Sequence, residues 1–298
     1  MEKAKVYFIR EITPENVIKA YVALGKKLPG KVAVKVHSGE KGNQNYLKPE
    51  FMKPMVEYVN GTIVECNTAY AGERNSSEKH LKLLENHGWN KYFTVDLMDE
   101  SGPDMVLPIE NSHILKENYV GKNMANYDSM LVISHFKGHP MGGYGGALKQ
   151  LSIGCGSSVG KTWIHSAGRE KDQTKLWDNL SEQDKFLESM ADAAESVVRY
   201  FDNKGGMAFI NIMCNMSVDC DCCAVAEDPC MKDMGILIST DPVAIDQACL
   251  DLVYNSNDPG KNHFIERVES RNGVHTIESA SSLGVGSREY ELIDITEE

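Results

Sequence analysis

The chain has 298 residues, with 31 Lys and Arg against 43 Asp and Glu, which gives a formal net charge of −12 at pH 7. An acidic protein is poorly suited to nucleic acid or an anionic membrane surface, so we expect neither as a partner. No apolar run approaches the ~20 residues of a membrane span, and the start MEKAKVYFIR carries no apolar signal segment. We therefore expect a cytoplasmic protein with reduced cysteines; its oligomeric state stays open.

Short apolar runs alternate with helical patterns along the chain. In the first part of the chain the patterns predict a strand over residues 5–9, a helix that begins at Pro14 with Thr13 as its cap, a strand over 31–36, a helix over 49–59, a strand over 62–65 and a helix over 76–87. A strand over 129–134 and a long helix over 182–202 follow. The last part has predicted strands over 208–213 and 235–238, a helix over 242–254, shorter helices up to 283, and a strand over 289–293. This alternation is typical of an α/β fold with a largely parallel sheet flanked by helices. We expect a single domain over residues 1–298, with possible lobes of about 1–170 and 171–298.

Five of the eight cysteines fall in residues 214–230, in the run CNMSVDCDCCAVAEDPC. Two aspartates, Asp219 and Asp221, lie directly beside Cys220, and neighbouring carboxylates make a thiolate less favourable, which a bound metal or iron–sulfur cluster would offset. In an extended segment Cys220 and Cys222 point to one side, and Asp221 and Cys223 to the other. The alternative is a loop of buried or idle thiols.

A glycine-rich stretch, residues 135–168, follows the predicted strand at 129–134. Glycine lets the backbone approach a ligand closely, and ligands of α/β proteins bind beyond the carboxyl ends of strands. His139, Lys149 and His165 are candidate catalytic residues, because histidine moves protons or binds metal and lysine holds anions; singly, each could be an ordinary loop residue. The residues expected to bind a cofactor are Lys137, Gly142, Gly143, Gly145 and Gly146.

Two further features of the sequence are weaker signals of a functional site. Residues 156–162, GSSVGKT, resemble a phosphate-binding loop, but the glycine that the motif requires first falls on Cys155, which disfavours nucleotide hydrolysis. Lys35 and His37 lie at a predicted strand end and are weaker site candidates. The histidines expected at the surface are His80, His87, His263 and His275.

The segments VAVKVHSG, SHFKGHPMGGYGGALKQLSIGCGSSVGKTWIHS, VDCDC and MGILISTDPVAIDQACLDLV together resemble the domain-of-unknown-function 362 family over most of the chain. The resemblance implies an α/β fold and a frequent association with iron–sulfur clusters. Some members carry a ferredoxin-like module, whose C-x₂-C-x₂-C-x₃-C-P run is absent here. The family pattern matches Cys155, Cys220 and Cys222, and it does not require Cys214, Cys223 or Cys230.

A fainter similarity connects the chain with nickel-dependent lactate racemases. His139, Lys149 and His165 follow the order of three racemase residues, with separations of ten and sixteen positions. The similarity implies a proton-transferring histidine, a lysine that tethers the nickel pincer cofactor, and a metal-ligating histidine. The chain differs in having Ala-Leu before the lysine and in lacking recognisable residues for a substrate carboxylate.

Three hypotheses follow. The first is an iron–sulfur cluster, most simply 4Fe-4S, held by Cys155, Cys220 and Cys222 with Cys214, Cys223 or Cys230 as a fourth ligand. It would serve a redox or cluster-assisted role with a small anionic substrate or a redox partner protein. The second is a racemase-like or isomerase-like metalloenzyme that uses the His/Lys/His constellation with nickel. The third is a zinc-stabilised binding protein without enzymatic activity.

Overall fold

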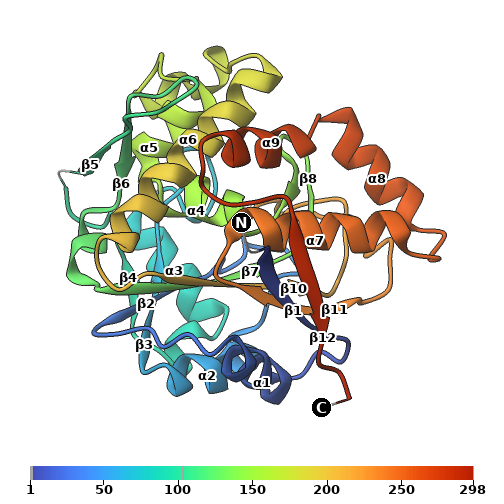
Figure 1. Cartoon of the computed structure of the whole chain (residues 1–298). Coiled ribbons are helices and arrows are strands. Elements are labelled where there is room, and N and C mark those ends of the chain that lie inside the picture. Colours follow the sequence, from blue (N-terminus) through green and yellow to red (C-terminus); the bar gives the residue numbers. More distant parts are fainter. Residues whose placement is uncertain (1–2, 103, 298) are drawn as a thin grey trace.

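A single eight-stranded sheet forms the centre of the molecule in a computed structural model, which describes residues 3–102 and 104–297 (Figure 1). Its order is β12-β1-β11-β10-β7-β2-β3-β4, and only β11 runs antiparallel to its neighbours among these described strands. Strands of both expected lobes share this sheet, and β1 from the first lies between β12 and β11 from the second. The strands are β1 (Ala4–Ile9), β2 (Val32–Lys35), β3 (Gly61–Glu65), β4 (Val95–Leu97), β7 (Ser129–His135), β10 (Met207–Met213), β11 (Gly235–Ser239) and β12 (Tyr290–Asp294). The predicted α/β class with a largely parallel sheet is confirmed.

Helices cover both faces of the sheet, with α1 and α2 on one side and α4, α6, α7 and α9 on the other (Figure 1). As predicted, the Thr13 hydroxyl caps α1 by accepting a hydrogen bond from the Asn16 N–H at 3.1 Å. The α-helices are α1 (Pro14–Leu24), α2 (Pro49–Tyr58), α3 (Ser77–Asn86), α4 (Ala147–Cys155), α5 (Ser158–His165), α6 (Gln183–Asp202), α7 (Pro242–Asn255), α8 (Lys261–Ser270) and α9 (Val274–Ser282). Three short 3₁₀ turns are η1 (Trp89–Lys91), η2 (Lys122–Asn126) and η3 (Gln173–Asp178).

Alternation along the strands divides the core between the two faces. In β7, Leu131 and Ile133 pack toward α1 and α2, whereas Met130 and Val132 pack toward α4, α6 and α7. Every residue of β7, β10 and β11 is buried, as expected for central strands covered on both sides.

Two hairpins lie outside the main sheet. One joins β5 (Met105–Pro108) to β6 (Glu117–Val120), and the other joins β8 (Lys137–His139) to β9 (Gly143–Gly145). The second hairpin is the first part of the glycine-rich stretch, which continues into α4 and α5. The stretch is therefore folded and almost wholly buried rather than an open loop.

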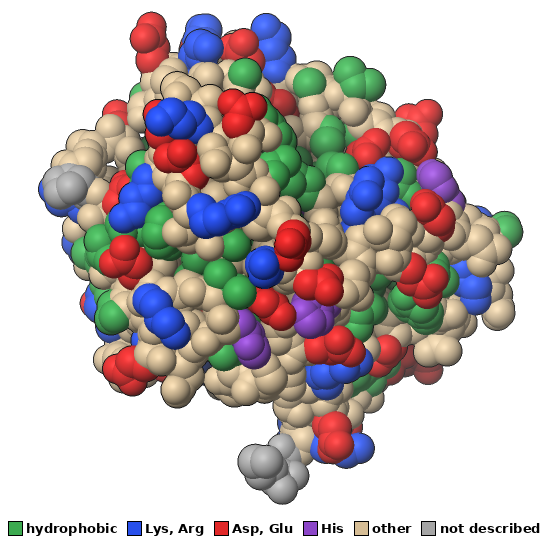
Figure 2. Space-filling model, turned by 90° about the horizontal axis from the view of Figure 1, so that it is seen from above, with side chains coloured by type: hydrophobic (Ala, Val, Ile, Leu, Met, Phe, Trp, Pro, Cys, Tyr) green, Lys and Arg blue, Asp and Glu red, His purple; other side chains and the backbone are tan. Residues whose placement is uncertain are grey.

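The surface mixes charges of both signs. Figure 2 shows acidic and basic side chains interspersed over the face seen from above in Figure 1. Within the described part of the chain, no helix combines the length and the apolar character that crossing a membrane requires.

A buried carboxylate on α7 fixes the start of α4. Asp246 is fully buried and accepts hydrogen bonds from the Ala147 and Leu148 N–H groups at 2.8 and 3.0 Å, from Asn211 Nδ2 at 2.8 Å and from the Tyr144 hydroxyl at 3.2 Å. Burial raises the pKa of Asp246 to about 6, so the group is charged at neutral pH. It satisfies the unpaired N–H groups of the first turn of α4 and ties that helix to β9 and β10.

Asp246→Asn should destabilise the protein by roughly 1–3 kcal/mol, because the amide group leaves some of the four buried donors unpaired. Urea unfolding at neutral pH measures this loss. Asp251→Asn is the matched control on the same helix; Asp251 is partly exposed and accepts from the Tyr290 hydroxyl and Gln247. Equal losses in the two variants would contradict the anchoring role of Asp246.

Candidate functional site

The Cys-Asp-Cys segment, residues 220–222, forms a tight turn after β10. The Cys223 N–H donates to the Cys220 carbonyl oxygen at 2.9 Å, and the Cys222 N–H donates to Cys220 Sγ at 3.3 Å. This turn brings the thiols of Cys220 and Cys222 together. The segment is not extended, so the expectation that Cys223 points away with Asp221 was wrong: Cys223 lines the same cavity as Cys222.

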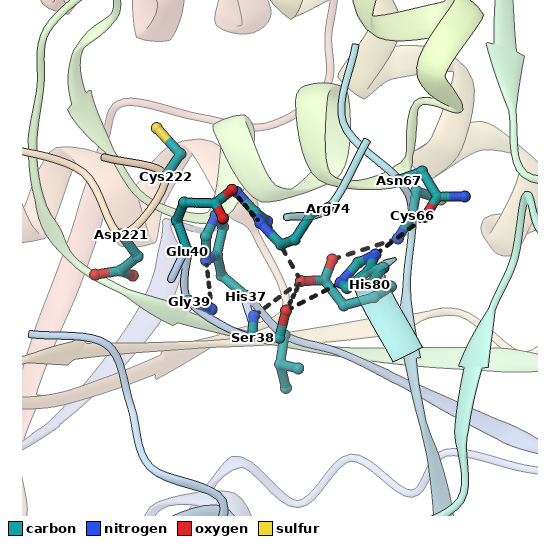
Figure 3. Close-up of polar contacts among 12 residues, drawn as sticks. His37, Ser38, Gly39, Glu40, Cys66, Asn67, Arg74, His80, Asp221 and Cys222 are labelled. Carbon is teal, nitrogen blue, oxygen red and sulfur yellow. Dashed lines mark hydrogen bonds and ion pairs between the residues drawn. The ribbon is translucent and has the colours of Figure 1, made fainter. Parts of the chain in front are cut away.

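The Asp221 side chain lies on the opposite side of this turn. Figure 3 shows Cys222 and Asp221 pointing in opposite directions. Asp221 is buried and contacts His135 Nδ1 at 2.9 Å and Lys137 Nζ at 3.0 Å. Burial alone would raise the pKa of Asp221, but His135 and Lys137 hold it well below its usual range. Lys137, expected to bind a cofactor, is therefore engaged by a carboxylate that anchors the turn.

His139, Cys220 and Cys222 form a compact group, which we call the His–Cys group. His139 Nε2 and the two Sγ atoms all lie within 4.8 Å of one another. His139 Nε2 is 3.7 Å from Cys222 Sγ, and Lys149 Nζ is 3.9 Å from Cys220 Sγ. Burial raises the pKa of the Cys220 thiol, so nearby positive charge is needed to hold it as a thiolate.

The other predicted metal ligands lie outside the His–Cys group. Cys155 is buried at the end of α4, where its carbonyl oxygen accepts from Cys66 Sγ at 3.5 Å. Lys149 is the α4 residue beside the thiols, and a helix rises about 1.5 Å per residue, so the Cys155 backbone lies about 9 Å further along. Cys214 is held apart by β10, with its carbonyl oxygen 2.6 Å from His135 Nε2.

A small cavity of about 170 Å³ opens beside the His–Cys group, and we call it the site cavity. The three predicted catalytic residues all line it, although they come from β8, α4 and α5. Its polar lining consists of Tyr70, His139, Lys149, His165, Cys222 and Cys223. Its apolar lining consists of Pro140, Met141, Ile153, Leu176 and Trp177.

The two cavity histidines are held in opposite tautomers. His139 Nδ1 accepts from the Gly142 and Met141 N–H groups at 2.8 and 3.1 Å, so a neutral ring carries its proton on Nε2. His165 Nδ1 lies 2.7 Å from the Lys161 carbonyl oxygen and must donate to it, which leaves the lone pair on Nε2. Burial lowers the pKa of both histidines to about 4, so both are neutral at pH 7. One ring presents a proton and the other presents a lone pair.

A buried network of charged groups lies beside the turn (Figure 3), and the Glu40 N–H joins it to the turn by donating to the Asp221 carbonyl oxygen at 2.8 Å. Glu65 accepts from Lys35 Nζ at 2.7 Å, and Arg74 Nε donates to Glu40 at 3.2 Å. Arg74 Nη2 also donates to the Tyr70 hydroxyl at 3.4 Å, which connects the network with the site cavity. Lys35, a weaker site candidate, is thus part of a structural ion pair.

One histidine of this network contradicts its predicted position. His80 was expected at the surface, but it is fully buried, with Nδ1 3.1 Å from Asn67 Oδ1 and Nε2 3.2 Å from Ser38 Oγ. The polar pattern of α3 did not indicate this burial, because the partners of His80 are polar side chains that follow the carboxyl ends of β2 and β3. His37 accepts from the Gly39 N–H and lies beside the same network.

The predicted cofactor-binding glycines allow close packing. A Cβ at Gly146 would lie 2.4 Å from Asp246 Oδ1, and one at Gly143 would lie 2.8 Å from Gly273 Cα. Gly145 faces the Lys137 and Lys149 side chains. Gly142 donates its N–H to His139, as described above.

Three residues of the site were missed by the sequence analysis. Tyr70 lies in an irregular segment and Trp177 on the short turn η3, and neither belongs to a motif, so nothing in the sequence distinguished them. Asp246 did have a signal, since it is an acid on the buried face of α7 between Ile245 and Ala248.

The fold and site define an α/β protein with a cavity of thiols, histidines and a lysine beyond the carboxyl ends of its parallel strands. The chain belongs to the family described as domain of unknown function (DUF362), whose model matches residues 32–251. The resemblance recognised in the sequence is therefore confirmed. No curated protein matches the chain at a significant level.

Two solved structures show a distant likeness. The lactate racemase apoprotein from Thermoanaerobacterium thermosaccharolyticum is 13% identical, with 70% of this chain and 50% of that chain covered and a TM-score of 0.42. A protein from Thermotoga maritima, whose crystal structure was a Northeast Structural Genomics Consortium target, is 11% identical, with 92% and 60% covered and a TM-score of 0.44. This chain thus spans half the length of the first protein and three fifths of the length of the second.

Asp221→Asn should destabilise the protein by about 3–5 kcal/mol, because it leaves Lys137 and His135 buried without their anion. Asp219→Asn is the matched control two residues away, where Asp219 is partly exposed and paired with Arg267; we expect about 1 kcal/mol or less. Urea unfolding of both variants at neutral pH compares them. A loss for Asp221→Asn no greater than for Asp219→Asn would show that Asp221 does not anchor the turn.

Proposed function

We propose that the protein is a metal-dependent enzyme that transfers protons on a small anionic substrate bound in the site cavity. The observation that carries this proposal is the convergence of His139, Lys149 and His165 on one cavity beside the paired thiols of Cys220 and Cys222. A cavity that gathers titratable groups in defined protonation states is the arrangement expected of an acid–base site.

The donor set fits one metal ion. Thiolates are soft donors that suit zinc, nickel or iron. With zinc–sulfur bonds of about 2.3 Å, two thiolates on one tetrahedral ion lie roughly 3.8 Å apart. The 4.8 Å limit on the His–Cys group agrees with such a shared ion. In a 4Fe-4S cluster each thiolate binds a different iron, so its ligands lie further apart.

Cys220 and Cys222 are the metal donors that we propose, with Cys223 beside them. His139 is less suited to ligation, because its Nδ1 accepts two backbone N–H groups and its Nε2 keeps the proton. A metal-ligating histidine normally donates its second N–H to an oxygen, whereas His139 Nδ1 accepts.

The two rings then have different roles. His165 Nε2 is placed to accept a proton from the substrate, and the neutral His139 is placed to donate a hydrogen bond from Nε2–H to a substrate oxygen, while Lys149 holds the anionic group of the substrate. The bound metal would supply Lewis-acid polarisation of a substrate oxygen. The buried position of His139 and the apolar lining limit access of water, which strengthens these interactions.

The iron–sulfur cluster remains the alternative, with a redox partner protein in place of a small substrate; the three thiols at 220–223 favour it. A zinc ion in a purely structural role is the third possibility. We also propose a cytoplasmic location, which the eight free cysteines support.

Purification without oxygen followed by metal and sulfide analysis tests the metal assignment. We expect one zinc, nickel or iron per chain, no acid-labile sulfide, and at least tenfold less metal in Cys220→Ser. Cys230→Ser is the control, because the Cys230 thiol donates to the Met216 carbonyl oxygen away from the group. Several irons with sulfide would establish the cluster instead, and unchanged loading of Cys220→Ser would refute the ligand choice.

Replacing either cavity histidine should slow proton transfer by about 100-fold or more, the usual contribution of a positioned base or of a hydrogen-bond donor that stabilises developing charge. The assay follows interconversion of enantiomers, or exchange of the carbon-bound hydrogen with solvent deuterium, for a panel of 2-hydroxy acids. His139→Gln and His165→Gln are compared with His263→Gln, whose ring is exposed and paired with Glu227. If the panel reacts and His139→Gln or His165→Gln keeps full activity, the acid–base assignment is wrong.

A further inference from the structure

The lining of the site cavity also indicates which class of substrate fits it. We propose that this substrate is a small monocarboxylate whose other end is apolar or aromatic, with the carboxylate on Lys149 and the apolar end against Trp177. The inference rests on the proposed function for its chemistry, but it concerns ligand selection and is testable without turnover.

The charges around the cavity favour a ligand with one negative charge. Among the described residues, no carboxylate lies within ion-pair distance of Lys149 Nζ, and its polar contact is Cys220 Sγ at 3.9 Å. The neighbouring cations are already neutralised, Lys137 by Asp221 at 3.0 Å and Arg74 by Glu40 at 3.2 Å. A lysine has three donors, so Lys149 can serve a thiolate and an anion together. A second carboxylate on the ligand would find no free cation here and would be desolvated without compensation.

The rest of the cavity wall offers apolar surface. Met141, Ile153, Leu176 and Trp177 line it together with Pro140, and Lys149 is the one lysine or arginine in its described lining. The volume of about 170 Å³ is below the ~300–1,000 Å³ typical of sites for drug-sized ligands. A small molecule with one negative charge and one compact apolar group therefore matches this lining.

Trp177 is the second observation that points to a ligand. Its side chain lies on η3, is 59% exposed, and has its ring centroid 6.3 Å from that of Tyr70. A large aromatic side chain with that exposure at the mouth of a cavity leaves apolar surface that a bound substituent would cover. The Tyr70 hydroxyl accepts a hydrogen bond from Arg74 Nη2 at 3.4 Å, which orients the Tyr70 ring.

Fluorescence titration of the metal-loaded and metal-free protein tests the proposal, with Trp177 as reporter. The probes are phenylacetate, its uncharged isostere phenylacetamide, and the dianion succinate. We expect a saturable change with phenylacetate at a Kd at least tenfold below that of either other probe. The change should vanish in Trp177→Phe and persist in Trp163→Phe, because Trp163 does not line the cavity.

Lys149→Gln should bring phenylacetate and phenylacetamide to equal Kd values by calorimetry, whereas Lys185→Gln, at an exposed position, should keep the preference for the acid. Binding of the amide by Lys149→Gln would also show that this variant is folded. Equal affinity of the wild-type protein for acid and amide, tighter binding of succinate, or no binding of phenylacetate in either metal state would overturn the proposal. A preserved preference in a protein that never loads metal would instead overturn the metal-dependent function and leave this inference standing.

Discussion

The ion pair of Asp221 with Lys137 and His135 is the interaction on which the site depends. A carboxylate between two cysteines would ordinarily oppose their ionisation, but here it is turned away and neutralised on the far side of the turn. Its contacts reach the end of β7 and the start of β8, so the turn is fastened to the strand that leads into the glycine-rich stretch. The same interaction therefore fixes the turn so that Cys222 lines the cavity, while the buried Cys220 and His139 of β8 keep their ligand atoms within 4.8 Å of the Cys222 thiol.

A second buried carboxylate, on α7, positions the α4 side of the cavity. Asp246 holds the first turn of α4, and Lys149 follows on that helix within one turn. Glycine at position 146 is required because any side chain there would displace the carboxylate. Two acids distant in the sequence thus set the positions of the thiols and of the lysine. The spacing of 3.9 Å between Lys149 Nζ and Cys220 Sγ depends on both.

The sequence predicted seven of the eight strands of the main sheet, because apolar runs such as 129–134 are local signals, as is the helix cap at Thr13; it missed the three-residue strand β4 at the edge. It also placed Cys220 beside Cys222, since two residues with one between them stay close in most conformations. It could not place Cys155, because the position of α4 depends on Asp246, a contact about a hundred residues away. The tautomers of His139 and His165 depend on backbone groups that no pattern reveals, and burial of His80 depends on partners from separate strands.

The balance of charge explains why such a site needs a cation. Burial raises the pKa of the Cys220 thiol, and Lys137 and Arg74 are committed to Asp221 and Glu40. Lys149 is then the one described cavity cation left to offset two thiolates, and it is also the group available to an anionic ligand. A metal ion on the thiolates removes this conflict, because it takes over their charge and leaves Lys149 for the substrate. Metal binding and anion binding should therefore reinforce each other at this site.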